Sequence, residues 1–463
     1  MKNIIVKMVE SWSNNTGNIN AIEDIINWID FLNKSICVNV NKISLDDSEF
    51  WYYDKLEGEI VNTNRSFFSI KGIIKKANDE IILEQPIIIQ DEIGYLGILC
   101  KEFDGVLNFL MQAKIEPGNL NKIQISPTIQ ATKSNFTQKH GGNKPKYLNY
   151  FINASNHEII VDQIQSEQSS RFYKKRNRNI IIKVDEYVEV LPNYKWMTLG
   201  QIKELMKIDN LVNMDTRTVL SCIPFSNIKL DEVQLENIYR LFKDKSLFNS
   251  IFYGGNENLL PKVYHYINNY KMFDNSEIEI VSLEKLNLWK MKEKEFISKK
   301  PYNFKVIFCD ISIEGREVSQ WTQPLFEADG VAIFGLLTCN DEGIKKFLVN
   351  LNSEVGCFDS IELGPSVQIE SIDKNKICNE VTSLFFNYLD CGKNIIFDNL
   401  LSEEGGRFYH EQNRNIIIEV EKSDLVNVPE GYLWIDYKSL NTMVQFNNCL
   451  NIQLRNLLSL LEV

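Results

Sequence analysis

The residues best able to do chemistry are concentrated in one stretch, 162–184, which reads DQIQSEQSSRFYKKRNRNIIIKV. Carboxylate, amide and guanidinium groups crowd there around a Phe-Tyr pair, and an aliphatic run follows. Guanidinium groups bind phosphate oxygens through paired hydrogen bonds, so Arg171, Arg176 and Arg178 could hold a diphosphate. Two purely structural roles for these groups remain open. Glu167 and Arg171 have the spacing of an ordinary helical salt bridge, and the basic residues could form an ion-pair network at a dimer interface.

A polar strand face is the second candidate for a functional surface. Alternate side chains of a strand share a face, so one face of the strand predicted over 123–132 would carry only amides and short hydroxyls: Gln124, Ser126, Thr128, Gln130 and Thr132. Such groups suit a sugar or a base better than bulk water, although a solvated outer face accounts for the same pattern. His140, in the loop that follows, could be an acid/base group or a surface histidine.

Two further clusters join these candidates, QAKIEPGN at 112–119 and NLVNMDTR at 210–217. Several familiar motifs are absent from the sequence. There is no G-x-G-x-x-G opening a βαβ unit, no P-loop and no G-x-S-x-G elbow, which argues against a classical nicotinamide site, a P-loop nucleotide site and an α/β-hydrolase. The four histidines form no pair at metal-ligand spacing, so a zinc site is not expected.

The elements that must position these residues occur twice. The stretch 162–184, called the motif below, returns at 398–420. Between 166–184 and 402–420, 12 of 19 positions are identical. Trp51 and Trp289 lie 238 positions apart, as do Pro127 and Pro365 and also Trp196 and Trp434. We therefore predict a duplication with three parts: repeat one in 1–225, a connector in 226–255 and repeat two in 256–463.

Hydrophobic periodicity gives each repeat a coarse outline. Repeat one is predicted to open with a helix over 19–34, to continue with a series of strands between residues 50 and 184, and to close with helices over 199–206 and 216–223. The connector is predicted to be helical around 235–242. Helices that bracket many strands are typical of an α+β unit.

Composition limits the class of protein. The 463 residues are 44% hydrophobic and carry a formal charge of −12, which is ordinary for a soluble protein and argues against nucleic acid as a partner. We find neither a signal peptide nor an apolar run long enough for a membrane span. The nine cysteines are scattered without a C-x-x-C pair, and Cys100, Cys222, Cys309 and Cys339 sit in apolar surroundings, which favours reduced core thiols in a cytoplasmic protein.

Four motifs carry a resemblance to a known family: Q-x-x-x-E-P-G-N at 112–119, Q-x-S-P-T-x-Q-A-T-x-S-N-x-T at 124–137, Q-S-E-Q-x-x-R-F-x-x-x-R-N-R-N at 165–179 and DNLVNMDTRTVLS at 209–221. With them the chain resembles the NDP-hexose 2,3-dehydratases over almost its whole length. The resemblance implies an α+β fold of two duplicated Nudix-like domains, with mixed sheets flanked by helices. It also implies a homodimer, and two nucleotide-sugar pockets per subunit of which one is catalytic. It implies no metal and no redox cofactor.

The implied reaction starts from an NDP-4-keto-6-deoxyhexose, usually dTDP-linked, and gives a 3,4-diketo-2,6-dideoxyhexose by loss of the C2 hydroxyl. It needs a base near C3, hydrogen-bond donors at the C4 oxygen and an acid near the C2 oxygen. A separate 3-ketoreductase would act on the product. The alternatives are a Nudix-like nucleotide-sugar hydrolase and a non-catalytic nucleotide-sugar-binding protein.

The resemblance also implies where the site lies. We expect the base and the acid among Glu167, His140 and Tyr147, without a ranking. Expected substrate contacts in repeat one are Gln130, Thr132, Asn135, Thr137, Gln168, Arg171, Arg176, Asn177, Arg178 and Asn179. Those expected in repeat two are Glu403, Glu404, Arg407, Tyr409, His410, Gln412 and Asn413.

Repeat two departs from the family pattern at two places. The loop QATKSNFTQKHGG at 130–142 becomes QIESIDKNKICNE at 368–380, and Asp215 has no counterpart in NNCLNIQLRNLLS. We therefore hypothesise that repeat one supplies the working pocket, with residues of repeat two facing it.

Overall fold

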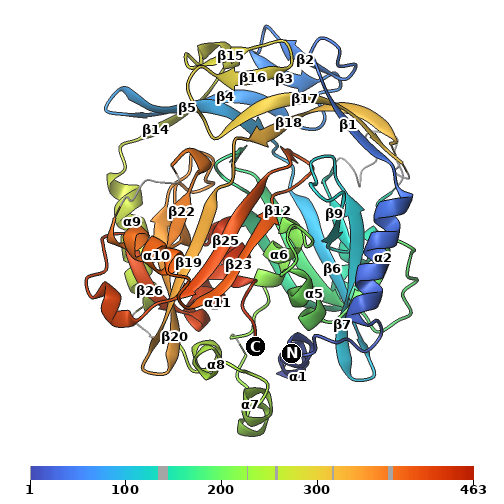
Figure 1. The fold of residues 1–463 in the computed structure, drawn as a ribbon, viewed down its shortest axis with the longest axis vertical. Helices are drawn as coiled ribbons and strands as arrows, with labels where there is room; N and C mark the ends of the chain where they lie inside the picture. Colours follow the sequence, from blue (N-terminus) through green and yellow to red (C-terminus); the bar gives the residue numbers. More distant parts are fainter. Residues whose placement is uncertain (1, 134–143, 227, 256–258, 315–317, 374–378) are drawn as a thin grey trace.

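The two halves of the chain fold into the same set of elements around a shared centre (Figure 1). The computed structural model describes residues 2–133, 144–226, 228–255, 259–314, 318–373 and 379–463. Within these residues four β-sheets form, each containing parallel and antiparallel pairs, and α-helices flank them. The predicted α+β class is confirmed. In the described residues, no helix has both the length and the apolar character needed to cross a bilayer.

Each repeat builds one lower sheet, in which β-branched runs form the central strands. Lower sheet one has the order β10 (Glu158–Ser166), β12 (Arg176–Lys183), β6 (Gly94–Phe103), β7 (Val106–Ile115) and β13 (Tyr194–Met197), with β8 (Ile123–Ser126) on β7 and β9 (Ile129–Ala131) on β6. Lower sheet two contains the equivalent strands β23 (Ile395–Ser402), β25 (Gln412–Glu419), β19 (Ile333–Asp341), β20 (Ile344–Asn352), β26 (Tyr432–Asp436), β21 (Glu362–Pro365) and β22 (Val367–Ile369).

Two upper sheets lie across one end of the lower pair (Figure 1). Upper sheet one contains β2 (Trp51–Asp54), β3 (Glu59–Asn62), β4 (Ser69–Ala77), β5 (Glu80–Ile89) and β11 (Phe172–Tyr173). Upper sheet two contains β15 (Trp289–Met291), β16 (Glu295–Ser298), β17 (Phe304–Ile313), β18 (Gln320–Ala328) and β24 (Phe408–Tyr409). Each sheet gains a sixth strand from the other repeat.

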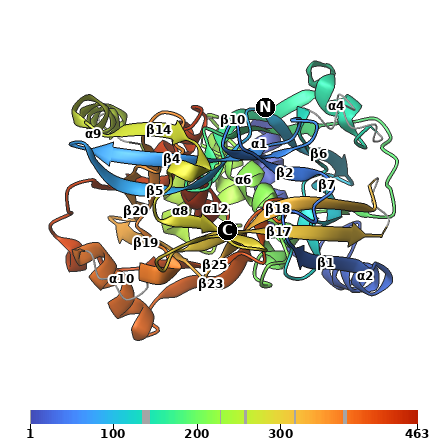
Figure 2. The ribbon, with the colours of Figure 1, turned by 90° about the horizontal axis from the view of Figure 1, so that it is seen from above.

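This strand exchange is reciprocal. The first strand of repeat one, β1 (Val38–Ile43), pairs antiparallel with β17 of repeat two, and β14 (Glu277–Val281) of repeat two pairs antiparallel with β4 of repeat one. Seen from above, β14 and β1 lie at opposite ends of the upper layer, each close to the helix that precedes it, α9 (Leu259–Phe273) or α2 (Ile22–Ser35) (Figure 2). Neither upper sheet is therefore complete without both repeats.

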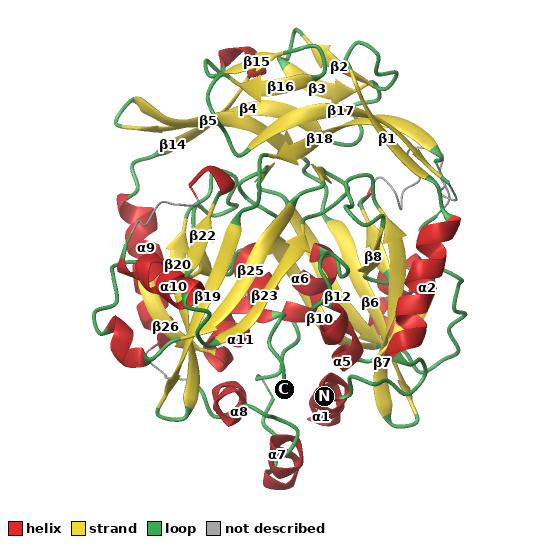
Figure 3. Cartoon of the chain, viewed as in Figure 1, coloured by secondary structure: helices red, strands yellow, loops and turns green. Residues whose placement is uncertain are grey.

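Helices cover the outer edges and the end of the molecule opposite the upper sheets (Figure 3). Two of them, α6 (Met214–Ser221) and α12 (Ile452–Leu458), are equivalent in the two repeats and pack against each other at the centre. The connector forms α7 (Glu232–Tyr239) and α8 (Lys245–Phe252). The other α-helices of the described residues are α1 (Lys2–Ser13), α4 (Leu148–Ile152), α5 (Leu199–Leu205), α10 (Glu380–Asp390) and α11 (Tyr437–Val444).

One hydrophobic core runs through both repeats, from Leu96 and Ile98 on β6 to Leu336 on β19, and α1 packs into it with Met8 and Trp12. A second core lies between the upper sheets, where Phe172 and Phe408, which occupy the same position in the two motifs, meet edge to face with ring centroids 5.8 Å apart. The two motifs therefore meet at the centre of the molecule.

Most predicted elements are found close to their expected bounds. The helices predicted over 19–34, 199–206 and 216–223 correspond to α2, α5 and α6, and the connector contains α7 as predicted. Helices α1, α4, α8 and α10 were not predicted. The amphipathic pattern of α8 was readable, because Leu247, Phe248 and Ile251 are buried on one face.

The single strand predicted over 123–132 is wrong. The chain forms β8 on β7, crosses at Pro127-Thr128, and continues as β9 on β6. Thr128 sits at the crossing, where its Oγ1 donates to the Leu110 carbonyl and accepts from the Leu99 amide at 2.9 Å. Ser366 makes the equivalent bonds in repeat two. Thr128 therefore joins two strands and does not share a polar face with the neighbours predicted for it.

Candidate functional site

Two buried arginines tie each motif to the opposite repeat. Arg217, on α6, donates to the Val212 carbonyl at 2.7 Å and to the Ser402 carbonyl at 2.8 Å. Arg455, on α12, donates in the same way to the Ser166 carbonyl. Both side chains are almost fully buried, and burial lowers the pKa of Arg217 to about 10. Each motif therefore begins on a carbonyl held by the other half of the chain.

The turn within each motif lies against the opposite repeat. After Ser166 the chain turns, pairs briefly as β11 and returns as β12; after Ser402 it does the same through β24 and β25. The first turn lies against Gly356, whose amide donates to the Ser169 carbonyl at 2.8 Å. The second lies against Gly118, whose amide donates to the Gly405 carbonyl at 2.7 Å.

Only glycine fits at these two crossings. A Cβ on Gly118 would lie 1.7 Å from the Phe408 carbonyl oxygen, and one on Gly356 would lie 1.9 Å from the Phe172 carbonyl oxygen. The glycine of the E-P-G-N motif therefore allows the close backbone approach that brings each turn over the opposite repeat.

Two equivalent polar clusters result, and each contains residues of both repeats. Site one comprises Lys114, Glu116, Gln130, Glu167, Lys175, Asn213 and Asp215 of repeat one with Glu404 and Arg407 of repeat two. Site two comprises the equivalent positions Asn352, Glu354, Gln368, Glu403, Glu411, Asn451 and Gln453 of repeat two with Gln168 and Arg171 of repeat one.

A ladder of amides supports site one. Gln130 Nε2 donates to Glu116 Oε1 at 3.3 Å, and Gln130 Oε1 accepts from Asn213 Nδ2 at 3.4 Å. Asn213 also begins α6, because its side-chain oxygen accepts from the Thr216 amide at 2.9 Å, which is ordinary N-cap geometry. The cap places Asp215 in the first turn of the helix, next to the ladder.

Four carboxyl groups converge in site one. Glu404 reaches over from repeat two: a Cβ on Gly406 would lie 2.6 Å from Glu404 Oε1 and 3.4 Å from Glu116 Oε1, so the two carboxyl groups flank this glycine. Burial, and then the neighbouring Glu167 and Glu404, raise the pKa of Asp215 well above its usual value. Burial also raises the pKa of Glu404 to about 7, although Arg407 opposes the rise.

Glu167 completes this set of acids. It is 3% exposed, its Oε1 accepts from Asn177 Nδ2 at 2.8 Å, and burial raises its pKa. Glu403 has the same partner in repeat two, because Asn413 Nδ2 donates to its Oε1 at 2.7 Å. A hydrogen-bonded pair of Glu and Asn is therefore present in both sites, as Glu167 with Asn177 in site one and Glu403 with Asn413 in site two.

Site one also contains three cations. Lys114 Nζ lies 3.1 Å from Glu116 Oε1. Lys175 is buried and donates to the Glu92 carbonyl; burial lowers its pKa to about 8, Glu167 opposes that change and Arg407 adds to it. Arg407 stacks on Phe68, with its guanidinium carbon 4.3 Å from the ring centroid. Lys175 and Arg407 therefore place two positive charges beside the acids.

Site two keeps the amide ladder. Gln368 Nε2 donates to Glu354 Oε1 at 2.7 Å, and Gln368 Oε1 accepts from Asn352 at 2.9 Å and from Asn451 at 3.1 Å. Asn451 caps α12 through the Leu454 amide, as Asn213 caps α6.

The charges of site two are different. Arg171, the counterpart of Arg407, stacks on Phe304, with its guanidinium carbon 4.1 Å from the ring centroid. Its Nη2 lies 3.7 Å from Glu370 Oε2. Thr132 occupies the position equivalent to Glu370 in repeat one. Glu411 replaces Lys175, and burial raises its pKa to about 8 although Arg171 opposes the rise. Since Asn352 also replaces Lys114, these positions supply three cations in site one and one in site two.

The three arginines predicted to hold one diphosphate have different neighbours. Arg171 contributes to site two. Arg176 stacks on Phe358, with its guanidinium carbon 3.8 Å from the ring centroid. Arg178 makes two 2.6 Å bonds to Asp162 on the neighbouring strand. Arg414 pairs with Asp398 in the same way, at 2.7 and 2.6 Å, so this pair links equivalent strands in both repeats.

Several other predicted residues have structural partners. The Tyr147 hydroxyl donates to the Glu189 carbonyl at 2.7 Å, and its ring packs in the core on the outer face of lower sheet one. Asn179 bonds the Asn177 carbonyl at 3.1 Å, and Gln412 accepts from Asn210 at 2.7 Å. The rings of Tyr409 and His410 stack with centroids 4.1 Å apart.

Predicted residues that the structure brings to the two sites are Gln130, Glu167, Gln168, Arg171, Asn177, Glu403, Glu404, Arg407 and Asn413. Asn135, Thr137 and His140 lie outside the described residues, and Thr132 is followed by only one more described residue before that gap.

Sequence reasoning included Lys175 in the basic cluster suited to a diphosphate and noted that Asp215 is lost in repeat two, but it gave Glu116 and Lys114 no role in the site. Comparison of the two repeats gives a signal for three of these four residues. Asp215, Lys114 and Lys175 change type between the repeats, to Gln453, Asn352 and Glu411, within stretches that otherwise match. Glu116 is retained as Glu354, so the same comparison could not single it out.

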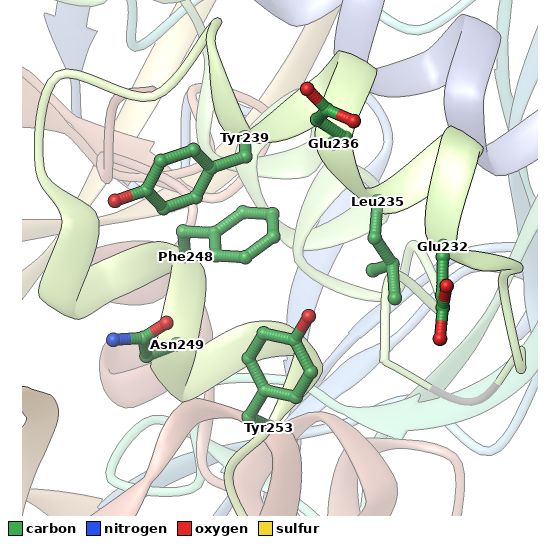
Figure 4. A pocket seen from close by; sticks show the side chains of 7 residues that line it. All are labelled: Glu232, Leu235, Glu236, Tyr239, Phe248, Asn249 and Tyr253. Carbon is green, nitrogen blue, oxygen red and sulfur yellow. The ribbon is translucent and has the colours of Figure 1, made fainter.

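Two surface hollows lie elsewhere. One, of about 270 Å³, lies between α7 and α8, with Tyr239, Phe248 and Tyr253 facing Leu235 and the carboxylates of Glu232 and Glu236 (Figure 4). The other, of about 730 Å³, lies between the upper sheets and is lined by Trp51, Tyr52, Trp289, Phe296 and their neighbours. The described residues that line them include none from sites one and two.

Comparison with known proteins identifies one family over most of the chain. A family model described as NDP-hexose 2,3-dehydratase matches it twice, at 22–223 and 260–461. Three curated relatives share the name dTDP-4-dehydro-6-deoxy-alpha-D-glucopyranose 2,3-dehydratase. The chain is 36% identical to that of Saccharopolyspora spinosa, over 91% of this chain and 87% of the relative. It is 32% identical to that of Amycolatopsis orientalis (94% and 89%) and 33% identical to that of Streptomyces violaceoruber (91% and 92%).

Proposed function

The chain belongs to the NDP-hexose 2,3-dehydratase family, and from that premise we propose that it removes the C2 hydroxyl of dTDP-4-keto-6-deoxyglucose. The curated relatives carry names for this activity, and they match the chain over both repeats. In this proposal the protein is a carbon–oxygen lyase. Its product is the 3,4-diketo-2,6-dideoxy sugar nucleotide, which a separate 3-ketoreductase then reduces. The family match favours this activity over nucleotide-sugar hydrolysis and over binding without reaction.

Site one is the working site in our proposal, and one observation carries the choice. At equivalent positions, Lys175 and Lys114 of site one correspond to Glu411 and Asn352 of site two. A diphosphate needs positive charge where it is taken out of water. Site one offers it, whereas Glu370 and Glu411 surround the arginine of site two.

We assign the diphosphate to Arg407 and Lys175. Arg407 presents a planar fork fixed by stacking on Phe68, and Lys175 adds a buried ammonium group beside it. The amides of Gln130 and Asn213 are suited to the sugar hydroxyls. Gln168 and Arg171, which were predicted for the same pocket from sequence, would instead belong to site two.

Three further properties remain proposals that the family resemblance supports. Each repeat would be a Nudix-like domain, two copies of the chain would form a homodimer, and the protein would work in the cytoplasm. The mixed sheets of each repeat and the buried cysteines are compatible with the first and the third.

The activity is tested by incubating the protein with dTDP-4-keto-6-deoxyglucose, a 3-ketoreductase and NADPH. Mass spectrometry should detect a product that has lost one water and gained two hydrogens. Release of dTMP from the substrate on addition of magnesium, without loss of water, would instead support a hydrolase.

A further inference from the structure

We propose that Glu404 of repeat two is the base that removes the C3 proton, and that Asp215 of repeat one is the acid that protonates the departing C2 hydroxyl. This assignment rests on the proposed function and on the choice of site one. It makes the reaction a joint act of both repeats, because each repeat supplies one of the two groups that transfer protons.

The differences between the two sites single out these two residues. Glu167, Gln130 and Asn213 of site one have identical counterparts in site two. The two positions that differ by exchange of a carboxyl group for an amide are 404, where Gln168 is the counterpart, and 215, where Gln453 is the counterpart. An amide keeps size and hydrogen bonding but cannot transfer a proton. Site two has therefore kept groups that bind and lost these two groups that react.

The space around Glu404 suits a group that must reach the sugar. Its turn carries Gly405 and Gly406, and the equivalent turn over site two carries Ser169 and Ser170. A side chain at position 406 would collide with the Glu404 carboxyl group. The glycines therefore leave this carboxyl group and that of Glu116 uncovered by side chains of the turn, where a sugar ring could approach them.

The surroundings of Asp215 suit an acid that meets a ligand hydroxyl. Its side chain is 2% exposed, and its Oδ2 has no hydrogen-bond partner among the described residues. A buried oxygen of this kind is costly unless a ligand satisfies it or the group is neutral. The sugar C2 hydroxyl is a partner of the right chemistry.

The electrostatics agree with these roles. Burial, and then the neighbouring carboxyl groups, raise the pKa of Asp215 well above its usual value, which favours the protonated form that an acid needs. Burial raises the pKa of Glu404 to about 7, which leaves a large ionised fraction at neutral pH and makes it a stronger base than an exposed carboxylate.

The reaction begins when Glu404 takes the C3 proton, and the C–H electrons form the C3–C4 double bond of an enolate. The enolate carbonyl re-forms, a C2–C3 double bond forms, and the C2–O bond breaks as Asp215 gives its proton to the oxygen, which leaves as water. The product is an enol. Return of a proton from Glu404 to C2, and passage of the O3 proton to Asp215, give the diketone and restore both groups.

The two roles can be separated in heavy water without a reductase. The wild-type protein should lose water from dTDP-4-keto-6-deoxyglucose and exchange the C3 proton of the remaining substrate for deuterium. Glu404→Gln should slow both processes by about 100-fold or more, the usual loss for a general base. Asp215→Asn should slow water loss by a similar factor but should retain C3 exchange.

Site two supplies controls for this experiment. Amides occur naturally at its equivalent positions, Gln168 and Gln453, so we expect both variants to fold. Glu354→Gln, in the amide ladder of site two, should change neither rate by more than about 3-fold. Calorimetric titration with dTDP should give wild-type affinity for Glu404→Gln and Asp215→Asn, which a merely structural role would not.

Three outcomes are decisive. C3 exchange that survives in Glu404→Gln overturns the base assignment, and exchange that is lost in correctly folded Asp215→Asn overturns the acid assignment. If either variant does not fold, Glu404→Asp or Asp215→Glu replaces it, and a wild-type rate in that variant also contradicts its role. If the wild-type protein neither exchanges C3 nor releases water, the proposed function itself has failed.

Discussion

Site one and site two have the same backbone arrangement but differ in the charges of their side chains. Both have the same capped helix, the same amide ladder and the same glycine crossing, because both repeats retain the residues that build them. They differ at Lys114, Lys175, Asp215, Glu404 and the position of Thr132, each replaced by a residue of another charge in its counterpart. Both copies have therefore kept the same scaffold. In our proposal, only site one has the proton-transferring groups Glu404 and Asp215 together with additional positive charge.

The largest expected effect comes from giving site one the charge of site two. Lys175→Glu introduces the residue found at Glu411, which would repel a diphosphate in a buried setting. We expect kcat/KM to fall by about 1,000-fold. Steady-state assays with the coupled reductase measure this. Glu411→Lys, the reverse change, should leave turnover within about 3-fold, and a comparable loss in both variants would remove the distinction between the sites.

Removal of the Arg407 guanidinium group is the second test. Arg407→Ala should weaken dTDP binding by about 100-fold, since a buried bidentate phosphate contact is lost. Isothermal titration with dTDP measures it. Arg414→Ala, which breaks a strand-linking pair with Asp398, is the matched control and should bind dTDP normally. Unchanged affinity in Arg407→Ala would exclude this residue from the nucleotide site.

The glycine crossings test whether the two turns are structurally equivalent. A Cβ at Gly356 meets the Phe172 carbonyl oxygen, so Gly356→Ala should lower the free energy of unfolding by roughly 2 kcal/mol. Gly118→Ala should cost a similar amount, because its Cβ meets the Phe408 carbonyl oxygen. Urea denaturation measures both. Gly118→Ala should reduce turnover more than Gly356→Ala does, as the turn it displaces carries Glu404.

The smallest effect concerns the acids of site two. Burial raises the pKa of Glu354 from 4.5 to about 7, so the folded protein binds the proton more tightly than the unfolded chain. The stability from this group is complete below about pH 4.5 and is lost as the pH rises to about 7. Glu354→Gln should therefore be more stable than wild type near pH 8, by on the order of 1 kcal/mol, with the difference vanishing near pH 4. Parallel urea titrations at the two pH values would reveal a pH-independent difference if this is wrong.

Much of the scaffold could be predicted from the sequence because it depends on local patterns. The 3.6-residue periodicity identified α2, α5 and α6, and the two copies of the motif revealed the duplication. The strand exchange could not be predicted, since β1 and β14 pair with partners chosen by tertiary packing. The break at Thr128 was missed because alternation of polar residues continues across it although the strand changes partner.

The site was predicted in part for the same reason. The motif identified Glu167, Glu404 and Arg407, but local spacing suggested that Arg171, Arg176 and Arg178 act together. Arg171 lies on the turn that crosses to the other repeat, near Glu370, whereas Arg176 and Arg178 lie on β12 and contact Phe358 and Asp162. Which arginine serves which site depends on the crossing of the two turns, which is a long-range property of the fold.

A structure of the protein with dTDP bound would test the choice of site most directly. We expect the phosphate oxygens to lie within hydrogen-bonding distance of Arg407 and Lys175, with Glu404 and Asp215 beyond them where the sugar would extend. A diphosphate bound instead to Arg171, beside Glu411 and Glu370, with site one empty, would contradict the assignment of site one as the working site.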